Sequence, residues 1–141
     1  MFKYIKLIIL FSSFLVACSP TNNKPVSIHF SADSNAIVIS DLNGASLLQL
    51  KNNMKTDSSY QNLVSVLQTP VEDDSTSMEM EWPGKLSVAN DQLVFTPKLP
   101  FVKGKTYLVE TMISAEFASG KDIVKSKVGY KVKPQQQLLK R

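Results

Sequence analysis

Apolar and polar residues alternate with a period of two along most of the chain after Pro25. In the first such stretch Val26, Ile28 and Phe30 share one face, and polar residues stand between them. This alternation is typical of strands that bury one side. About seven stretches of this kind follow one another between turn signals, so we expect an all-β fold, a single β-sandwich. After the first, the predicted strands are 36–39, 60–68, 78–82, 86–88, 93–96, 106–113 and 123–133. Residues 36–39 are a continuous apolar run and are therefore expected to be buried on both sides.

The alternation is interrupted after Asp41. Leu47, Leu50 and Met54 lie at helical spacing there, which predicts one short helical turn. Asp41 or Asn43 would cap this turn, because a short polar side chain accepts hydrogen bonds from the free N–H groups at a helix start.

A strand with one apolar side is predicted just before the turn Pro83-Gly84. Met78, Met80 and Trp82 alternate there with glutamates, so we expect a half-buried strand whose methionines and tryptophan face the core. Farther along, residues 86–96 predict a hairpin, because apolar stretches flank the turn residues 89–92.

The two ends of the C-terminal region differ in pattern. Residues 123–133 give the clearest alternation in the chain, with three valines and Tyr130 opposite four lysines. Those lysines would either protect a sheet edge from further pairing or contact an anionic surface. Residues 134–141 show no strand pattern, so we expect either a loose C-terminal tail or a short packed end through Leu138 and Leu139.

The N-terminus has the pattern of a secretory signal. Lys3 and Lys6 precede an uncharged apolar run, residues 7–17. A helix needs about 20 apolar residues to cross a bilayer, so this run is too short to span one. A basic start followed by a short apolar segment and the small residue Ala17 is typical of an export signal.

The apolar run ends at Cys18, the only cysteine of the chain. Leu15-Val16-Ala17-Cys18 resembles the lipobox of bacterial lipoproteins. The resemblance implies that residues 1–17 are a signal peptide removed before Cys18, that Cys18 carries lipid, and that the protein sits in the cell envelope with the membrane as a partner. Ser19 is not acidic, which favours an outer membrane. The polar, proline-containing residues 18–25 would form a tether.

Size and charge narrow the remaining possibilities. The chain has 141 residues and a net charge of +4, to which Lys3 and Lys6 of the signal contribute. The chain after the signal has the size of one domain and is only mildly basic, so nucleic acid is not an expected partner.

The middle of the chain carries a recognisable pair of motifs. A strand ends in Phe95-Thr96-Pro97, an apolar loop follows, and Gly104 precedes Tyr107 at the start of the next strand. Residues 84–109 are similar in this respect to bacterial Ig-like domains of surface-layer and adhesive proteins. The resemblance implies an Ig-like sandwich over residues 26–133, in which Phe95 enters the core, Pro97 stops the strand, Gly104 turns the chain and Tyr107 packs back.

No arrangement typical of an enzyme is visible. His29, the only histidine, stands among serines on the polar side of the first strand, and there is no Gly-x-Ser-x-Gly elbow. We therefore expect an exposed histidine and no catalysis.

Two metal sites are weaker alternatives. Copper could be held by His29, Met78 and Met80, whose soft and borderline ligand atoms suit that metal, if the three converge. Calcium could be held by residues 72–74 together with Asp91, although their spacing matches no calcium loop and a solvated acidic loop is favoured.

These patterns together predict a membrane-anchored lipoprotein whose non-catalytic Ig-like module binds an envelope protein or glycan, or has a structural role. No cofactor is expected. The alternative is a copper-binding envelope protein that uses His29, Met78 and Met80.

Overall fold

The computed structural model describes residues 25–71, 74, 76–113 and 134–141. The predicted signal, Cys18, most of the predicted tether and the predicted strand 123–133 lie outside these residues.

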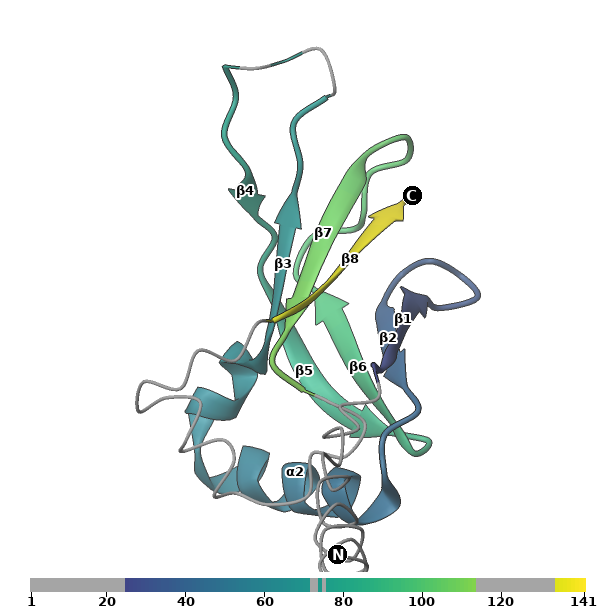
Figure 1. Ribbon diagram of the computed structural model, residues 1–141, viewed down its shortest axis with the longest axis vertical. Coiled ribbons are helices and arrows are strands. Elements are labelled where there is room, and N and C mark those ends of the chain that lie inside the picture. Colours follow the sequence, from purple (N-terminus) through teal and green to yellow (C-terminus); the bar gives the residue numbers. More distant parts are fainter. Residues whose placement is uncertain (1–24, 72–73, 75, 114–133) are drawn as a thin grey trace, which may run out of the picture.

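The described residues form two four-stranded antiparallel sheets (Figure 1). Sheet A has the strand order β1-β2-β6-β5, and sheet B has the order β4-β3-β7-β8. The strands of sheet A are β1 (Ser27–Phe30), β2 (Ile37–Ser40), β5 (Gly84–Ala89) and β6 (Gln92–Pro97). Those of sheet B are β3 (Val64–Gln68), β4 (Met80–Glu81), β7 (Thr106–Thr111) and β8 (Gln135–Lys140).

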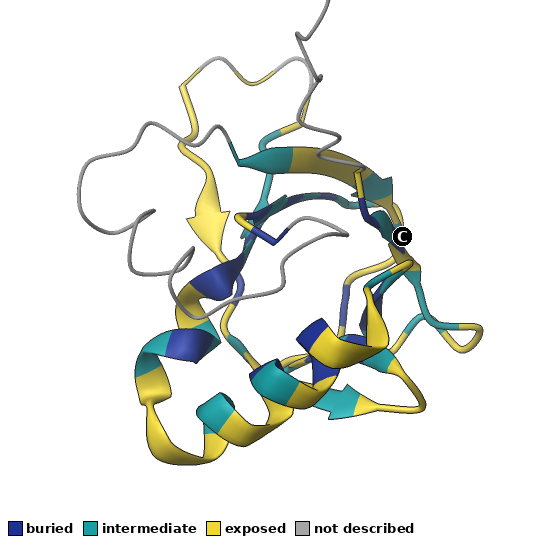
Figure 2. Cartoon of the chain, turned by 60° about the horizontal axis from the view of Figure 1, so that its bottom comes forward, coloured by how far each residue is buried: buried dark blue, intermediate teal, exposed yellow. Residues whose placement is uncertain are grey.

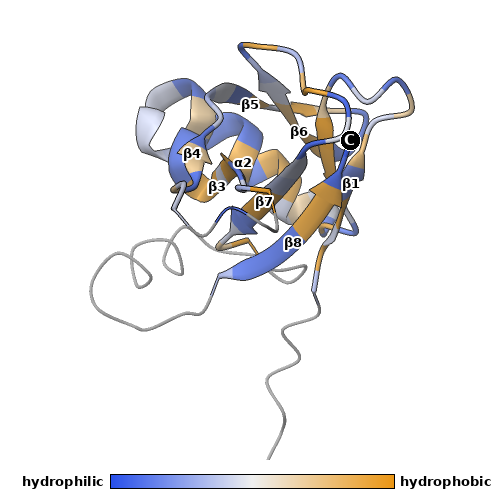
Figure 3. Ribbon diagram, turned by 90° about the horizontal axis from the view of Figure 1, so that it is seen from above, coloured by the Kyte–Doolittle hydropathy of each residue, from blue (hydrophilic) through white to orange (hydrophobic). Residues whose placement is uncertain are grey.

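The core lies between the two sheets, so the predicted all-β sandwich is confirmed. Sheet A contributes Ile37, Ile39 and Leu93, and sheet B contributes Val66 and Val109, all of them buried. The hydrophobic residues of the central strands are visible in Figure 3. Removing these apolar side chains from water is the main stabilising term for a domain without disulfides.

Four aromatic rings, those of Phe30, Trp82, Phe101 and Tyr107, pack against one another at one end of the core. Tyr107 is fully buried, and its ring centroid lies 5.5 Å from that of Trp82 and 4.8 Å from that of Phe101. Phe30 packs edge-on against Phe101 at 5.1 Å. The Tyr107 hydroxyl accepts a hydrogen bond from the Val102 N–H at 2.8 Å, which fixes the loop before β7.

Other positions singled out by the Ig-like resemblance also lie as expected. Phe95 is buried, Pro97 is the last residue of β6, and Gly104 has a φ of 81°, a left-handed conformation that glycine adopts without strain. The predicted hairpin joins β5 to β6 through Asn90 and Asp91, which both have positive φ.

The helical segment is longer than the single turn expected. Helix α2 (Gly44–Thr56) has 13 residues and is followed by the 3-10 helix η2 (Ser58–Leu63). Asn43 is the N-cap, because its side chain accepts a hydrogen bond from Ala45 N–H at 2.8 Å. Leu47 and Leu50 are buried as their spacing predicted. Strand β3 therefore begins at Val64 rather than at residue 60.

The prediction of a half-buried strand at residues 78–82 is wrong for most of its length. Strand β4 has only two residues, and Met78 and Met80 are 89% and 53% exposed. Met80 pairs with Gln68, the last residue of β3. At this end of sheet B the side chain of Met80 is not covered by sheet A and stays exposed. Only Trp82 reaches the core, and its indole N–H donates to the Leu99 carbonyl at 3.1 Å.

The C-terminal residues form a strand, which corrects the predicted tail at 134–141. Strand β8 pairs with β7 along its whole length, from Thr111↔Gln135 to Thr106↔Lys140. Leu139 packs against the core, whereas Leu138 points outward and is 58% exposed. The packed-end alternative is therefore right for Leu139 alone.

The two ends of the sandwich carry different elements. Ser27 at the start of β1 pairs with Ser40 at the end of β2, and α2 begins four residues later. The start of β1 and α2 therefore share one end. The connection between β3 and β4 projects from the opposite end (Figure 1). No helix in the described part of the chain is long and apolar enough to cross a membrane.

Candidate binding groove on sheet B

Three leucines form a row across the outer face of sheet B. Leu67 of β3 pairs with Leu108 of β7, which in turn pairs with Leu138 of β8. Their neighbours Val66, Val109 and Leu139 point inward to the core, so the three leucines point outward. Residues far apart in the sequence thus build one apolar row.

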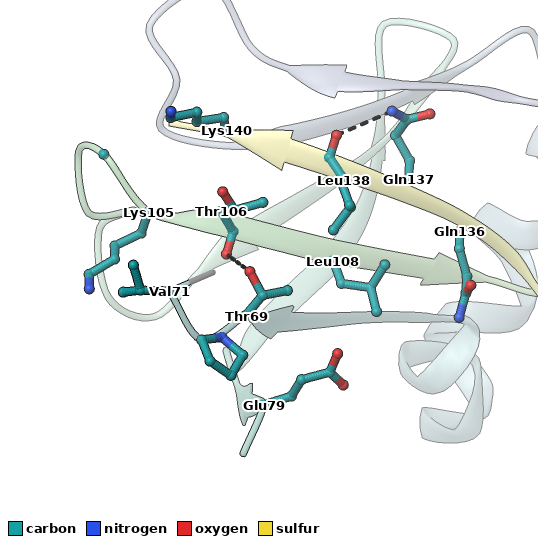
Figure 4. Close-up of a pocket in the computed structure, with 12 residues that line it drawn as sticks. Thr69, Val71, Glu79, Lys105, Thr106, Leu108, Gln136, Gln137, Leu138 and Lys140 are labelled. Carbon is teal, nitrogen blue, oxygen red and sulfur yellow. Dashed lines mark hydrogen bonds between the residues drawn. The ribbon is translucent and has the colours of Figure 1, made fainter. Parts of the chain in front are cut away.

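An open groove of about 900 Å³ lies over two members of this row, Leu108 and Leu138. Leu108 and Leu138 form its floor, and Thr69, Val71 and Glu79 from the β3–β4 connection border it (Figure 4). Val71 is 58% exposed, so two large apolar side chains, Val71 and Leu138, face solvent here. A concave surface with an apolar floor and a few polar groups is the usual form of a binding site.

The charges of the groove are separated. Lys105 and Lys140 stand on neighbouring strands at one end of the groove, because Lys140 pairs with Thr106, the next residue after Lys105. Glu79 lies on the opposite side, next to β3 (Figure 4). An elongated ligand would therefore bind in one direction, with its negative group near the lysines.

Strand β8 has a neighbour on one side only among the described strands. The Arg141 N–H donates to the Lys105 carbonyl at 2.9 Å, and bonding alternates along an antiparallel pair. The backbone groups of Gln136, Leu138 and Lys140 consequently point away from β7. Such an edge can accept an added strand.

Both edges of sheet A are met by a glutamine side chain from another part of the chain. The Gln135 amide accepts from Val26 N–H at 2.9 Å and donates to the Val26 carbonyl at 2.7 Å. Gln61 makes the same two contacts with Leu86 of β5, at 2.8 and 3.3 Å. In each case one side-chain amide takes the place of a neighbouring strand residue.

The structure does not bring the copper alternative together. His29 is exposed on β1, on the side of the sandwich where β1 lies near β8. Met80 is on β4, the opposite edge of sheet B from β8. With strands about 4.8 Å apart, the width of that sheet separates them. No group of three or more His, Cys, Asp or Glu residues that could hold a metal is found among the described residues.

The acidic residues considered for calcium also lie apart. Asp91 is in the β5–β6 turn and Asp74 is in the β3–β4 connection, while residues 72–73 are outside the description. The Asp74 carboxylate already accepts hydrogen bonds from Ser77 and Thr76. These bonds, that from the Ser77 hydroxyl first, hold the pKa of Asp74 far below its usual range.

Sequence reasoning missed every residue of the groove. The sequence places Leu108 in a strand, but nothing in it says which outward residues of other strands Leu108 meets. The adjacent pair Leu138 and Leu139 was the available signal, because in a strand one of two neighbouring leucines must face outward.

Comparison with known proteins adds no relative. No family model matches the chain, and searches of curated proteins and of solved structures give no match.

Proposed function

We propose that this protein is a lipid-anchored binding module of the bacterial envelope, with no catalytic activity of its own. Lipid on Cys18 would hold it to a membrane, the outer membrane where the host has one, and the groove on sheet B would bind a segment of another envelope protein. An Ig-like sandwich would be the displayed body.

The proposed anchor rests on the residues around Cys18. A basic start, an apolar run that is too short to span a bilayer and Leu15-Val16-Ala17 before a single cysteine agree with one another. One acyl chain gives only reversible membrane attachment, so the several chains that the lipobox resemblance implies would make it lasting.

The proposed binding mode rests on one observation, the outward-facing leucine row beside the edge of β8, of which Leu138 is exposed. An extended peptide that adds to a sheet edge gains main-chain hydrogen bonds, and its alternate side chains enter pockets beside the edge. Here an apolar side chain would lie on Leu108 and Leu138, and an acidic group would approach Lys105 and Lys140. This chemistry favours a polypeptide over a glycan, the other partner class.

The anchor is tested by mass spectrometry of the protein from its native membrane. We expect a product that begins at Cys18 and carries lipid, and we expect Cys18→Ser to release the protein from the membrane fraction. A product with a free thiol and residues 1–17 attached would rule the anchor out.

The groove is tested by photo-crosslinking in whole cells. A photoreactive residue at Gln136 should give one discrete protein adduct, and Leu138→Asp in the same chain should abolish it. The matched control places the photoreactive residue at Ser87, which is exposed on sheet A. An adduct that forms equally from Ser87, or that survives Leu138→Asp, would contradict binding in the groove.

A further inference from the structure

Helix α2 lies at the end of the sandwich where the chain enters from its N-terminus. The register Ser27↔Ser40 sets the start of β1 beside the end of β2, and α2 comes directly after β2 in the chain. The groove opens between β3, β7 and β8 and extends toward Thr69 and Lys140, at the other end. A tether attached before β1 therefore leaves from the α2 end.

The outer side of α2 combines an apolar residue with positive charge. Leu48 is 61% exposed, and Lys51, Asn52 and Lys55 are exposed on the same side, three to seven residues farther along the helix. Figure 2, seen from this end, shows the exposed outer side of the helix. The helix sequence GASLLQLKNNMKT contains no acidic residue. The nearest acids, Asp41 and Asp57, lie before and after it.

The length of chain between Cys18 and the domain keeps this face near the lipid. Residues 18–25 span at most about 29 Å when fully extended, since each residue adds at most about 3.6 Å. A flexible chain of that length has a mean extension of roughly 16 Å. Helix α2, about 20 Å long at 1.5 Å per residue, is thus within reach of the headgroups.

We propose that the outer face of α2, formed by Leu48, Lys51, Asn52 and Lys55, docks on the anionic lipid surface to which the protein is anchored. This inference rests on the proposed lipid anchor. The lysines attract anionic headgroups, and Leu48 enters the interface between them. The domain then stands on α2, and the groove faces away from the membrane.

The expected effect follows from the two lysines. Each lysine near an anionic surface contributes about a fivefold factor, so together they favour the docked orientation roughly 25-fold over the undocked one. Because the attraction is between charges at a wet surface, added salt weakens it.

The test uses the mature lipidated protein in vesicles of phosphatidylcholine mixed with phosphatidylglycerol and a headgroup-quencher lipid. A fluorophore is placed on Asn52→Cys, or on Leu99→Cys as the matched probe at the opposite end. We expect strong quenching at position 52 and weak quenching at position 99. Quenching at 52 should fall in phosphatidylcholine alone and in Lys51→Gln/Lys55→Gln. It should not fall in Lys103→Gln, an exposed lysine of the loop before β7.

Equal quenching at the two positions, or quenching at 52 that survives both Lys51→Gln/Lys55→Gln and neutral vesicles, overturns the docking of α2. The mass spectrum of the same preparation separates the two proposals. A lipidated product without quenching at 52 overturns only this inference, whereas a product without lipid overturns the proposed anchor and this inference with it.

Discussion

Gln135 joins the two sheets through a single side chain. Its amide satisfies both backbone groups of Val26, at 2.9 and 2.7 Å, although the two residues are 109 positions apart in the sequence. A buried or half-buried backbone group that loses its partner costs the free energy of its desolvation. The contact therefore holds the first described strand to the last.

We expect Gln135→Ala to lower the free energy of unfolding by about 1–3 kcal/mol, because Val26 N–H and C=O lose their partners. Urea unfolding followed by circular dichroism measures the change. The matched control is Gln137→Ala on the same strand, whose amide bonds only to the Leu138 carbonyl next to it. An equal decrease in the free energy of unfolding in the two variants would show that the contact with Val26 does not stabilise the fold.

Asp33 organises the β1–β2 loop. Its carboxylate accepts from the Ser31 hydroxyl at 2.6 Å and from the Asn35 backbone and side chain at 3.1 and 3.0 Å. These bonds, that of Ser31 first, lower the pKa of Asp33 below 3.8. Because the folded pKa is the lower one, the stabilisation is present above pH 3.8 and is lost as the pH falls through the folded value.

We expect an NMR titration of the carboxyl carbon to show Asp33 titrating below its ordinary pKa, and Ser31→Ala to raise that pKa by removing its largest cause. An Asp33 titration that Ser31→Ala leaves in place would refute this account of the loop.

Among the elements, β5 leaves no room for a side chain at Gly84, where it pairs with the end of β6. A Cβ added there would lie 2.6 Å from the Thr96 carbonyl oxygen and would also contact the Phe95 ring. Gly44, the first residue of α2, has nothing within 4 Å of such an atom. One glycine is thus required by packing and the other is not.

We expect Gly84→Ala to destabilise the fold by roughly 1–3 kcal/mol, because the Phe95 ring and a backbone oxygen must shift. Gly44→Ala should leave stability unchanged or raise it by up to about 1 kcal/mol through helix propensity. The measurement is the melting temperature of each variant, compared with that of the unaltered chain. Similar melting temperatures for the pair would contradict the close contact.

An element can be predicted from the sequence when the interactions that form it are between residues close together in the chain. The β5–β6 hairpin and the buried positions Leu47 and Leu50 were predictable, since a short turn and helical spacing are local signals. The length of α2 was not, because Asn52 and Asn53 have low helix propensity and the helix continues through tertiary contacts such as Asn53 with the Tyr60 hydroxyl at 3.0 Å.

Strand β8 was missed for the same reason. Three consecutive glutamines followed by two leucines show no alternation, as the change from hydrophilic to hydrophobic along β8 in Figure 3 makes plain. The segment is extended because β7 offers an edge and Val26 offers two partners for Gln135. Both causes lie far away in the sequence.

For the whole molecule, β8 is part of the sandwich rather than an appendage. Removing residues 134–141 deletes the contact of Gln135 with Val26, the packing of Leu139 and one complete edge of sheet B. Natural domains are stable by only about 5–15 kcal/mol, so such a loss is a large part of the total.

We expect truncation after residue 133 to cost roughly 3–5 kcal/mol, as a lost core leucine and two hydrogen bonds together suggest. The control replaces residues 71–78 with a Gly-Ser linker, because the described residues of that stretch are exposed. Its melting temperature should stay close to that of the unaltered chain. An unchanged melting temperature after truncation would show that residues 134–141 are a tail that does not stabilise the fold.

The candidate groove could not have been predicted before the fold. Leu108 and Leu138, which form its floor, come from two strands that are separate in the sequence, and only the pairing register aligns them. The residues of the copper alternative illustrate the opposite case, because His29 and Met80 are compatible as ligands but stand on strands at different edges. Ligand chemistry can be inferred from residue types, whereas convergence requires topology.

The two glutamines that meet the edges of sheet A bear on how copies of this chain would behave under the proposed lipid anchor, which would crowd them in one plane. Proteins confined to a surface collide edge to edge far more often than free ones, and each collision between unpaired strands is an opportunity for fibre growth. With Val26 and Leu86 already engaged, sheet A is a poor template for such growth at both of its borders. Any self-association would thus be directed to sheet B, where an occupied groove would also block it.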